Sequence, residues 1–546
     1  MSGEHVIVGN VVGNDDDSNQ PAVLPIPRSS RKHMSTSDKV GFLLRHVEAM
    51  QPRLTENGPV ALLPGDQGRY EKISGVAFKV HARAFLDAQV GASLDRDTWQ
   101  DFQEQVAAVS SSWPHAPMFV RCGSMDGCDR WIDMVGEQGS KFICFNGGGW
   151  SLEDSCEIPF ARGDGMAPLP EPVRGGSLRD FERYANFSSE DWLLVWAWIG
   201  YCLRGETWEH AKSTDPADGP FLPLVITGQR HSGKTTATKF IASLVDPSLS
   251  GALAPLPKRR DALAAHVNGR FLLVSDNESS LGRESSDTLC RLCVGERFIE
   301  RRMYFQGLTF TVVAKRPVIT NSISNLVNRT DLASRCLILE LQPIPFKSAS
   351  DVIPRDIKEK SGQMFGALLD VMYRAEQLLA TGIECSVDAR GAGFNLYGEA
   401  FSQAMGHAPG IFTAAREGRA LKAEEEAIAD NPIREMIDKL MEGRDTWQGT
   451  SAMFLQQSRE KLSEAFFRTP GAPLGATKVT RDLNDIKPSL AREYLIETNV
   501  DLRGPLGSSA KRGLVITRVT SGPKPISATP LDHPYARTMT QEEIPC

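Results

Sequence analysis

Residues 228–235 constrain the possible fold more than any other segment of the chain. They read Gly-Gln-Arg-His-Ser-Gly-Lys-Thr, which fits the pattern G-x-x-x-x-G-K-[ST]. A β-rich apolar run at 222–227 precedes them, and a helical run at 236–244 follows. A strand, a loop and a helix N-terminus in this order direct backbone N–H groups at a phosphate. The segment therefore predicts an α/β fold with a P-loop NTPase core.

We expect this loop to hold ATP. Lys234 would reach the β- and γ-phosphates, and the Thr235 hydroxyl would ligate Mg²⁺. His231 is more typical of a variable loop position than of a catalytic base. A chance match to the pattern is the alternative, and the flanking strand and helix weigh against it. The residues expected to contact ATP are Gly228, Gln229, Arg230, His231, Ser232, Gly233, Lys234, Thr235 and Thr236.

A second apolar strand, residues 271–276, ends in a carboxylate. Asp276 would hold Mg²⁺, directly or through water. Asn277 and Glu278 follow at the carboxyl edge of the strand, where ligands bind in parallel α/β sheets, and either could orient the attacking water. The alternative for Asp276 is an ordinary aspartate at the end of a strand.

A third strand, residues 317–320, ends at Asn321. A polar side chain there can sit between Asp276 and the γ-phosphate and sense whether that phosphate is present. Arg335 precedes a further strand at 336–341. It could be an arginine finger that reaches a neighbouring subunit's γ-phosphate and stabilises transition-state charge. A surface salt bridge is the competing interpretation for Arg335.

The composition narrows the class of protein. The chain has 546 residues, 41% of them hydrophobic and 24% charged, which is typical of a globular protein of roughly three or four domains. A net charge of −7 argues against a protein that coats nucleic acid by charge alone, but allows local basic patches. The apolar run at 192–203 falls short of the ~20 residues of a membrane span. The acidic start of the chain is unlike a signal peptide. We therefore expect a cytoplasmic protein without a membrane partner.

These motifs, in this order, resemble the AAA+-type ATPases of helicase superfamily 3, and most closely the primase-associated helicase modules of phages, plasmids and poxviruses. The chain is also similar to a bacterial and prophage family of ATP-binding proteins. The resemblance implies a ring-forming ATPase, commonly a hexamer, with ATP sites between subunits. It also implies the roles given above for Lys234, Thr235, Asp276, Asn321 and Arg335. The segments that carry it are GQRHSGKTT (228–236), LLVSDN (272–277), SDTLCRL (286–292), ERRMY (300–304), KRPVITNSI (315–323) and RTDLASRCLILELQPI (329–344).

Two features depart from that family. Asn277 follows Asp276 where superfamily 3 helicases usually have a second acid, so Glu278 would substitute or hydrolysis would be slow. The hairpin expected at 298–313 has no lysine at its tip, which reads Phe-Gln-Gly at 305–307. Four basic residues near its base could still track a phosphate backbone, with ion pairs to nearby glutamates as the alternative. They are Arg301, Arg302, Lys315 and Arg316.

The segment 431–520 is predicted to be a winged-helix-like domain. Its helical run at 476–493 is a candidate recognition helix that places Lys478 and Arg481 on one side. A glycine-rich turn with Lys511 and Arg512 precedes the last strand and would form the wing. These four side chains suit phosphates or a DNA groove. The segment carries only 14 basic against 11 acidic residues, and winged helices also bind proteins, so protein contact is the alternative.

The expected fold is an α/β P-loop NTPase core of AAA+ and superfamily 3 type, with an N-terminal α+β domain and a C-terminal helical plus winged-helix region. Cys122, Cys128, Cys144 and Cys156 fall in the α+β domain, but their spacing lacks the close pairs of zinc ribbons, so we expect ordinary thiols. The expected parts are disordered tails at 1–36 and 521–546, the α+β domain and linker at 37–175, the ATPase at 176–345, a helical region at 346–430 and the winged helix at 431–520.

The leading hypothesis is a Mg²⁺–ATP-dependent motor on DNA, a ring-forming superfamily 3-like replicative helicase of a phage or mobile element. Its expected partners are single-stranded or forked DNA, further copies of itself in a hexamer, and other replication proteins. The main alternative is a nucleotide-dependent switch or scaffold in replication control or phage defence that does not unwind DNA. A nucleotide kinase also uses a P-loop, but the length, the late winged helix and the position of Arg335 argue against it.

Overall fold

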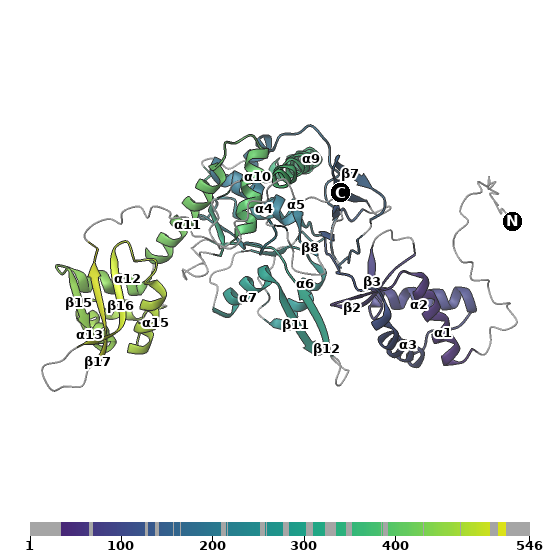
Figure 1. Ribbon diagram of the computed structural model, residues 1–546, viewed down its shortest axis with the longest axis horizontal. Helices are drawn as coiled ribbons and strands as arrows, with labels where there is room; N and C mark the ends of the chain where they lie inside the picture. The colour runs from purple at the N-terminus through teal and green to yellow at the C-terminus, as the bar shows by residue number, and fades with distance from the viewer. Residues whose placement is uncertain are drawn as a thin grey trace, which may run out of the picture. The chain divides into compact units, whose positions relative to one another are not determined.

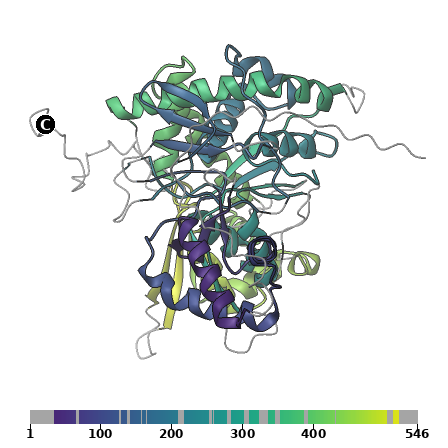
Figure 2. The same cartoon turned by 90° about the vertical axis from the view of Figure 1, so that its right-hand side faces the viewer.

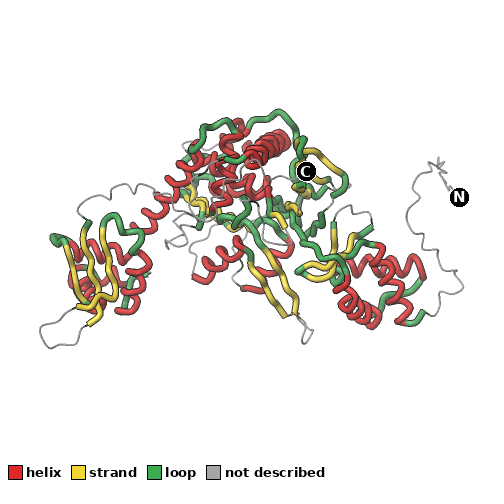
Figure 3. The backbone as a smooth tube through the Cα atoms, viewed as in Figure 1, coloured by secondary structure: helices red, strands yellow, loops and turns green. Residues whose placement is uncertain are grey.

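A computed structural model of the protein describes most of the chain, which divides into two compact units, Met1–Met118 and Phe119–Cys546. Figure 1 labels the helices and strands used throughout, and Figure 3 colours them by type. The residues that the structure describes are 34–64, 69–125, 129–136, 141–156, 158–163, 165–208, 215, 217–251, 257, 259–276, 283–301, 309–322, 335–344, 352–383, 385, 391–429, 431–469, 471–502 and 511–519.

The first unit is a small α+β body with its own core. Its helices are α1 (Thr36–Ala49), α2 (Val76–Val90) and α3 (Arg96–Val109), and its antiparallel sheet has the order β1 (Arg53–Thr55), β2 (Gly58–Leu62), β3 (Tyr70–Lys72). Ser35 and Asp38 form a reciprocal capping box that starts α1. Buried apolar residues one helical turn apart, such as Phe78, Ala82 and Leu86, close the core.

Two histidines meet between α1 and α2 in this unit. The Nε2 atoms of His46 and His81 lie 2.9 Å apart, and the His46 ring stacks on Phe85. Burial, and then the neighbouring His81, lower the pKa of His46 from 6.5 to about 4. The unfolded chain therefore binds more protons than the folded chain between these two pH values.

We expect the first unit to lose stability as the pH falls from 6.5 to 4, by roughly 1–2 kcal/mol once the shift is discounted for partial exposure of the ring. Hydrogen exchange of α1 and α2 peptides in the full chain measures this. At pH 5 these peptides should be less protected from exchange in the wild type than in His46→Gln. This difference between the two proteins should be larger at pH 5 than at pH 7.5. An equal difference at both pH values would exclude the histidine pair as the cause.

The second unit begins with a five-stranded sheet of order β7 (Gly149–Glu153), β6 (Phe142–Asn146), β5 (Arg130–Asp133), β4 (Cys122–Met125), β8 (Thr207–Trp208). The sheet packs beside α9 (Val352–Thr381), and the Trp150 indole donates to Asp370 on that helix at 2.8 Å (Figures 1 and 2). The α+β domain at 37–175 stays a prediction, while the contacts of the structure group β4–β7 with the residues that follow Met118. The reason is that β4–β7 bury their apolar side chains in the core of the following segment.

A four-stranded parallel sheet forms the centre of this unit. Its order is β10 (Leu273–Ser275), β13 (Val318–Asn321), β9 (Leu224–Thr227), β14 (Leu337–Glu340). The helices α5 (Lys234–Val245), α6 (Arg260–Gly269) and α7 (Arg283–Val294) connect the strands. The antiparallel pair β11 (Glu296–Arg301) and β12 (Thr309–Ala314) follows α7. All four central strands run the same way, so their carboxyl ends meet at one edge.

Helices cover this sheet and share its core. The apolar run at 192–203 lies in α4 (Ser189–Arg204), which is buried from Asp191 to Arg204. Next to α4 lie α9, α10 (Ala392–Ala404) and α11 (Ile411–Ala429), as Figure 1 shows. The short helix η3 (Leu178–Tyr184) packs on α9. The helical region expected at 346–430 therefore belongs to the same hydrophobic core as the parallel sheet. Within the described part of the chain, none of the helices combines the length and apolarity that a bilayer crossing requires.

A buried ion pair links the five-stranded sheet to the parallel sheet. Arg121 and Asp246 are both fully buried, and the guanidinium donates to the carboxylate at 3.1 and 2.7 Å. Asp246, at the end of α5, also accepts from the backbone N–H groups of Phe271 and Leu272 just before β10. The carboxylate thereby ties the α5 C-terminus to the strand that leads to Asp276.

Replacing Arg121 with alanine should destabilise the second unit by about 3–5 kcal/mol, because it leaves the Asp246 charge buried without this partner. Urea unfolding followed by circular dichroism measures the loss. Arg374→Ala is the control, because Arg374 is an exposed arginine on α9 in the same unit. An unchanged unfolding midpoint for Arg121→Ala would contradict the expectation.

The last part of the chain has a separate core. It contains α12 (Pro432–Met441), β15 (Thr446–Gly449), α13 (Ser451–Lys461), α14 (Glu464–Phe467), α15 (Ala476–Ile486), β16 (Tyr494–Leu502) and β17 (Lys511–Arg518). The strands form an antiparallel sheet of order β15-β17-β16. One detail differs from expectation: the helical run expected at 476–493 ends at Ile486 in α15.

Candidate functional site

The loop between β9 and α5 adopts a backbone that only particular residues tolerate. Gly228 and Gly233 have φ of 151° and 83°, in the region that disfavours side chains. A Cβ on Gly228 would lie 2.7 Å from the Ser232 hydroxyl and 3.0 Å from the Leu341 carbonyl oxygen. The loop therefore turns tightly where it leaves β9, close to the residue that follows β14. Helix α5 begins at Lys234, so its first backbone N–H groups lie at the loop.

Lys234 folds over this loop. Its ammonium donates to the carbonyl oxygens of Gly228 at 2.8 Å and Gln229 at 2.7 Å. Burial lowers the pKa of Lys234, and the nearby Asp276 carboxylate opposes that shift. The Lys234 ammonium is thus held against the loop and near the Asp276 carboxylate.

Two side chains from two elements converge on one carboxylate oxygen at the carboxyl edge of the parallel sheet. The Thr235 hydroxyl on α5 donates to Asp276 Oδ1 at 3.0 Å. The Asn321 amide at the end of β13 donates to the same oxygen at 2.6 Å. The strand order explains this convergence, because β13 lies between β9 and β10. The structure therefore brings Lys234, Thr235, Asp276 and Asn321 together.

The other expected ATP-site residues have different positions. Gln229, Arg230 and His231 are exposed on the loop, while Ser232 is buried. Asn277 and Glu278 lie outside the described residues. Arg335 is exposed and precedes β14, so it lies at the opposite edge of the sheet from Asp276 and Asn321. In the described structure it is not part of the cluster around Asp276.

Of the four basic residues near the hairpin, the two with described side chains are bound within the protein itself. Arg316 is buried, and its guanidinium donates to the carbonyl oxygens of Val267 and Arg270 at 3.2 and 2.9 Å. Lys315 pairs with Glu206 at 3.3 Å and lies over the Phe221 ring. These contacts speak against a role for either in binding a phosphate backbone. Arg302 and the side chain of Arg301 lie outside the described residues.

The C-terminal candidates also differ among themselves. The Lys478 ammonium donates to the carbonyl oxygens of Gly471 and Ala472, so it fixes the segment before α15. Arg481 is 58% exposed and lies 3.6 Å from Asp482. Arg512 on β17 is exposed, whereas the Lys511 side chain lies outside the described residues. Arg481 and Arg512 are therefore the described candidates that remain accessible to a ligand.

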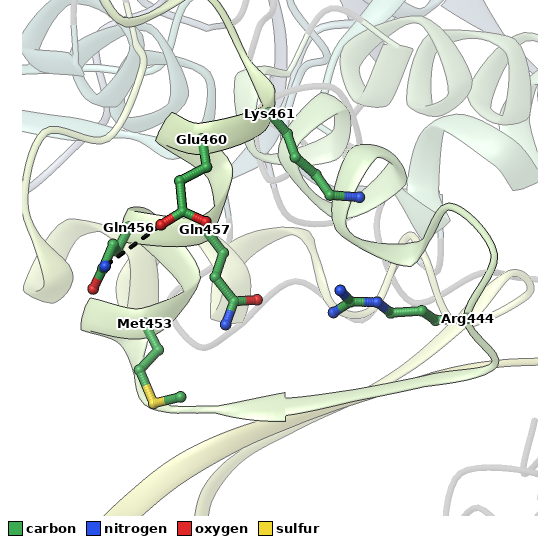
Figure 4. Close-up of a pocket in the computed structure, with 6 residues that line it drawn as sticks. All are labelled: Arg444, Met453, Gln456, Gln457, Glu460 and Lys461. Atoms are coloured by element: carbon green, nitrogen blue, oxygen red, sulfur yellow. Dashed lines mark hydrogen bonds between the residues drawn. The ribbon is translucent and has the colours of Figure 1, made fainter.

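A surface hollow of about 440 Å³ lies beside α13 in this C-terminal part (Figure 4). Its polar lining is largely engaged with the protein: Lys461 donates to the Lys439 carbonyl oxygen, and Gln457 accepts from the Trp447 indole. We assign it no role. Its lining residues are Arg444, Met453, Gln456, Gln457, Glu460 and Lys461.

One residue of the candidate site lies outside the motifs that the sequence analysis used. Thr238 follows Thr235 by one helical turn on α5, and its hydroxyl accepts a hydrogen bond from the Asn321 amide at 2.9 Å. The helical period places positions three apart on one face of α5, which could have indicated Thr238 once Thr235 was chosen.

Comparison with known proteins gives one family match. The model of the family described as "Actinomycete integrative conjugative element replication protein" matches residues 179–416. This range includes the parallel sheet and the cluster around Asp276. The match suggests a replication-associated function for a mobile element, and hence an interaction with DNA. A superfamily 3 helicase is a finer assignment than this match supports.

Other comparisons add little. No curated protein matches the chain. Two solved apo structures of the NrS-1 C-terminal region, both of the A form, are 11% identical to it and cover 71% of this chain and 96% of theirs. Their TM-scores are 0.30 and 0.32, and values this low assign no fold.

Proposed function

We propose that this protein is a Mg²⁺–ATP-dependent motor that acts on DNA in the replication of a mobile element, built on a P-loop NTPase core of AAA+ and superfamily 3 type. The observation that carries the proposal is the convergence of Thr235 and Asn321 on Asp276 beside the Lys234 loop. A nucleotide phosphate fits this edge because the loop supplies backbone N–H groups and an ammonium, and the strand supplies a carboxylate.

The donor set also fits Mg²⁺. A threonine hydroxyl and an aspartate carboxylate oxygen lie 3.0 Å apart, and hard oxygen ligands of this kind are what Mg²⁺ prefers beside substrate phosphates. Thr235 and Asp276 would hold the ion, which neutralises charge on the β- and γ-phosphates when bound. Lys234 would leave its two carbonyl acceptors and bind the phosphates. Asn321 would orient the reacting end of the nucleotide from the neighbouring strand.

The proposal includes a ring of subunits, commonly six. From Arg335 to the end of β14 the chain rises roughly 15 Å along the strand, so Arg335 lies far from the ATP site of its own subunit. An arginine at that edge can serve catalysis only at a neighbour's site. The position of Arg335 thus favours the shared-site arrangement that the superfamily 3 resemblance implies, with single-stranded or forked DNA as the substrate.

DNA binding by the C-terminal part rests on Arg481 and Arg512. We expect Arg481→Ala and Arg512→Ala each to weaken duplex binding and to reduce the salt dependence, log K against log salt, by about one unit of slope. Fluorescence anisotropy across a salt series measures both. Arg468→Ala is the matched control, since Arg468 is 81% exposed in the same part of the chain. Unchanged binding in both variants would assign this part to protein contacts.

A nucleotide-dependent switch without unwinding is the second candidate. It is favoured by Asn277, which replaces the second acid, and by the absence of lysine from 305–307. ATP turnover with and without forked DNA separates the two functions. The motor predicts stimulation by DNA, and predicts that changing Arg301 and Arg302 to alanine removes that stimulation. Turnover that no DNA stimulates would favour the switch.

A further inference from the structure

Thr238 is a buried hydroxyl at the back of the candidate site. Its exposed fraction is 0%, and that of Asn321 is 1%. The side chains meet between α5 and β13, where the Asn321 amide nitrogen lies 2.9 Å from the Thr238 hydroxyl oxygen. A hydrogen bond in such a place is costly to lose, because bulk water does not reach either partner to replace it.

The chemistry of the partners fixes the orientation of the Asn321 amide. The ionised Asp276 carboxylate can only accept, so the Asn321 atom 2.6 Å from it must be the amide nitrogen. That nitrogen carries two hydrogens, and the second is directed at the Thr238 hydroxyl, which accepts it. A flipped amide would turn its carbonyl oxygen toward the carboxylate and repel it.

We propose that Thr238 is a positioning residue for ATP hydrolysis: by accepting the second hydrogen of the Asn321 amide, it holds the amide nitrogen against Asp276. The inference rests on the proposed ATPase function. Asp276 Oδ1 also accepts from Thr235, so a misplaced Asn321 would loosen the pair of oxygens assigned to Mg²⁺. Thr238 lies behind these residues and touches neither nucleotide nor metal in this scheme. Its loss should therefore affect turnover more than ATP binding.

Thr238→Val tests the inference, because valine keeps the branched shape and removes the acceptor. We expect kcat for ATP to fall on the order of 10- to 100-fold, with KM changed by less than about twofold. The Mg²⁺ concentration for half-maximal turnover should rise. Thr238→Ser restores the acceptor and should recover most of both values. Ser243→Ala is the matched control, since it removes a hydroxyl from α5 that bonds only its own helix in the described contacts.

A second pair of variants covers the case in which Thr238→Val fails to fold. Thr238→Ala also removes the acceptor and takes its place. Asn321→Leu should cause a loss at least as large as that of Thr238→Ala, and adding Thr238→Ala to Asn321→Leu should cause no further loss. Wild-type kcat and Mg²⁺ dependence in a folded Thr238→Val would overturn the inference, as would additive losses in the double variant.

Lys234→Ala, measured in parallel, separates this inference from the proposed function. Turnover that is lost in Lys234→Ala but normal in Thr238→Val removes only the role of Thr238. A wild-type protein that turns over no ATP with any DNA overturns both.

Discussion

Replacing Lys234 with alanine should lower ATP turnover on the order of 100- to 1000-fold, the scale seen when one preorganised charge-stabilising donor is removed from an active site. The ammonium lies over the loop, bound to the carbonyl oxygens of Gly228 and Gln229, at the position where the proposed function places the phosphates. Phosphate release by the full-length protein, with Mg²⁺ and ATP, measures the change.

Lys239→Ala is the control for that variant. Lys239 is exposed on the same helix, α5, so its loss removes an equal charge without touching the loop. We expect it to keep wild-type turnover. If Lys234→Ala retained turnover close to that of Lys239→Ala, the nucleotide site would have to be sought elsewhere in the chain.

Local sequence patterns were enough to find most of the candidate site. The loop at 228–235, the acid that ends the strand before Asn277 and the polar end of the third strand are each readable from a few neighbouring residues. In a parallel sheet these strand ends must share an edge, and the structure places Thr235, Asp276 and Asn321 within hydrogen-bonding distance.

Features set by tertiary packing were not readable in this way. Arg316 looks like an accessible cation beside Lys315 in the sequence, but the carbonyl oxygens that bind it come from α6 and the residue after it. Thr238 has no motif, because its role depends on how close β13 comes to α5. To predict either role, one must know how close two segments far apart in the chain lie in space. Composition and residue spacing do not carry that information.

The structure groups residues 119–175 with the segments that follow them, and the reason is again one of tertiary packing. The sequence pattern of strands β4–β7 is that of an ordinary small sheet. From this local pattern, the strands were predicted to belong to the domain that precedes them. Their partners lie later in the chain: Arg121 pairs with Asp246, and Trp150 bonds Asp370. A buried charge pair across such a separation is visible only in three dimensions.

Replacing Arg335 with alanine should lower turnover on the order of 1000-fold if it is an arginine finger, while ATP binding to the loop persists. Arg335 and Asp276 lie at opposite edges of one sheet. The lost turnover should therefore reflect a missing contact between two subunits and not a defect within one subunit. Mixing separates these cases. Arg335→Ala subunits keep an intact Lys234 loop, and Lys234→Ala subunits keep an intact Arg335.

A mixture of the two inactive proteins should therefore regain part of the wild-type turnover, since some interfaces join an intact loop to an intact arginine. Arg374→Ala, an exposed arginine on α9, should be active without mixing and serves as the control. A binding assay with a fluorescent ATP analogue verifies that Arg335→Ala still loads nucleotide. Turnover that never recovers in any mixture would mean that Arg335 does not act between subunits. The proposed ring with shared ATP sites would then lose the support that the position of Arg335 gives it.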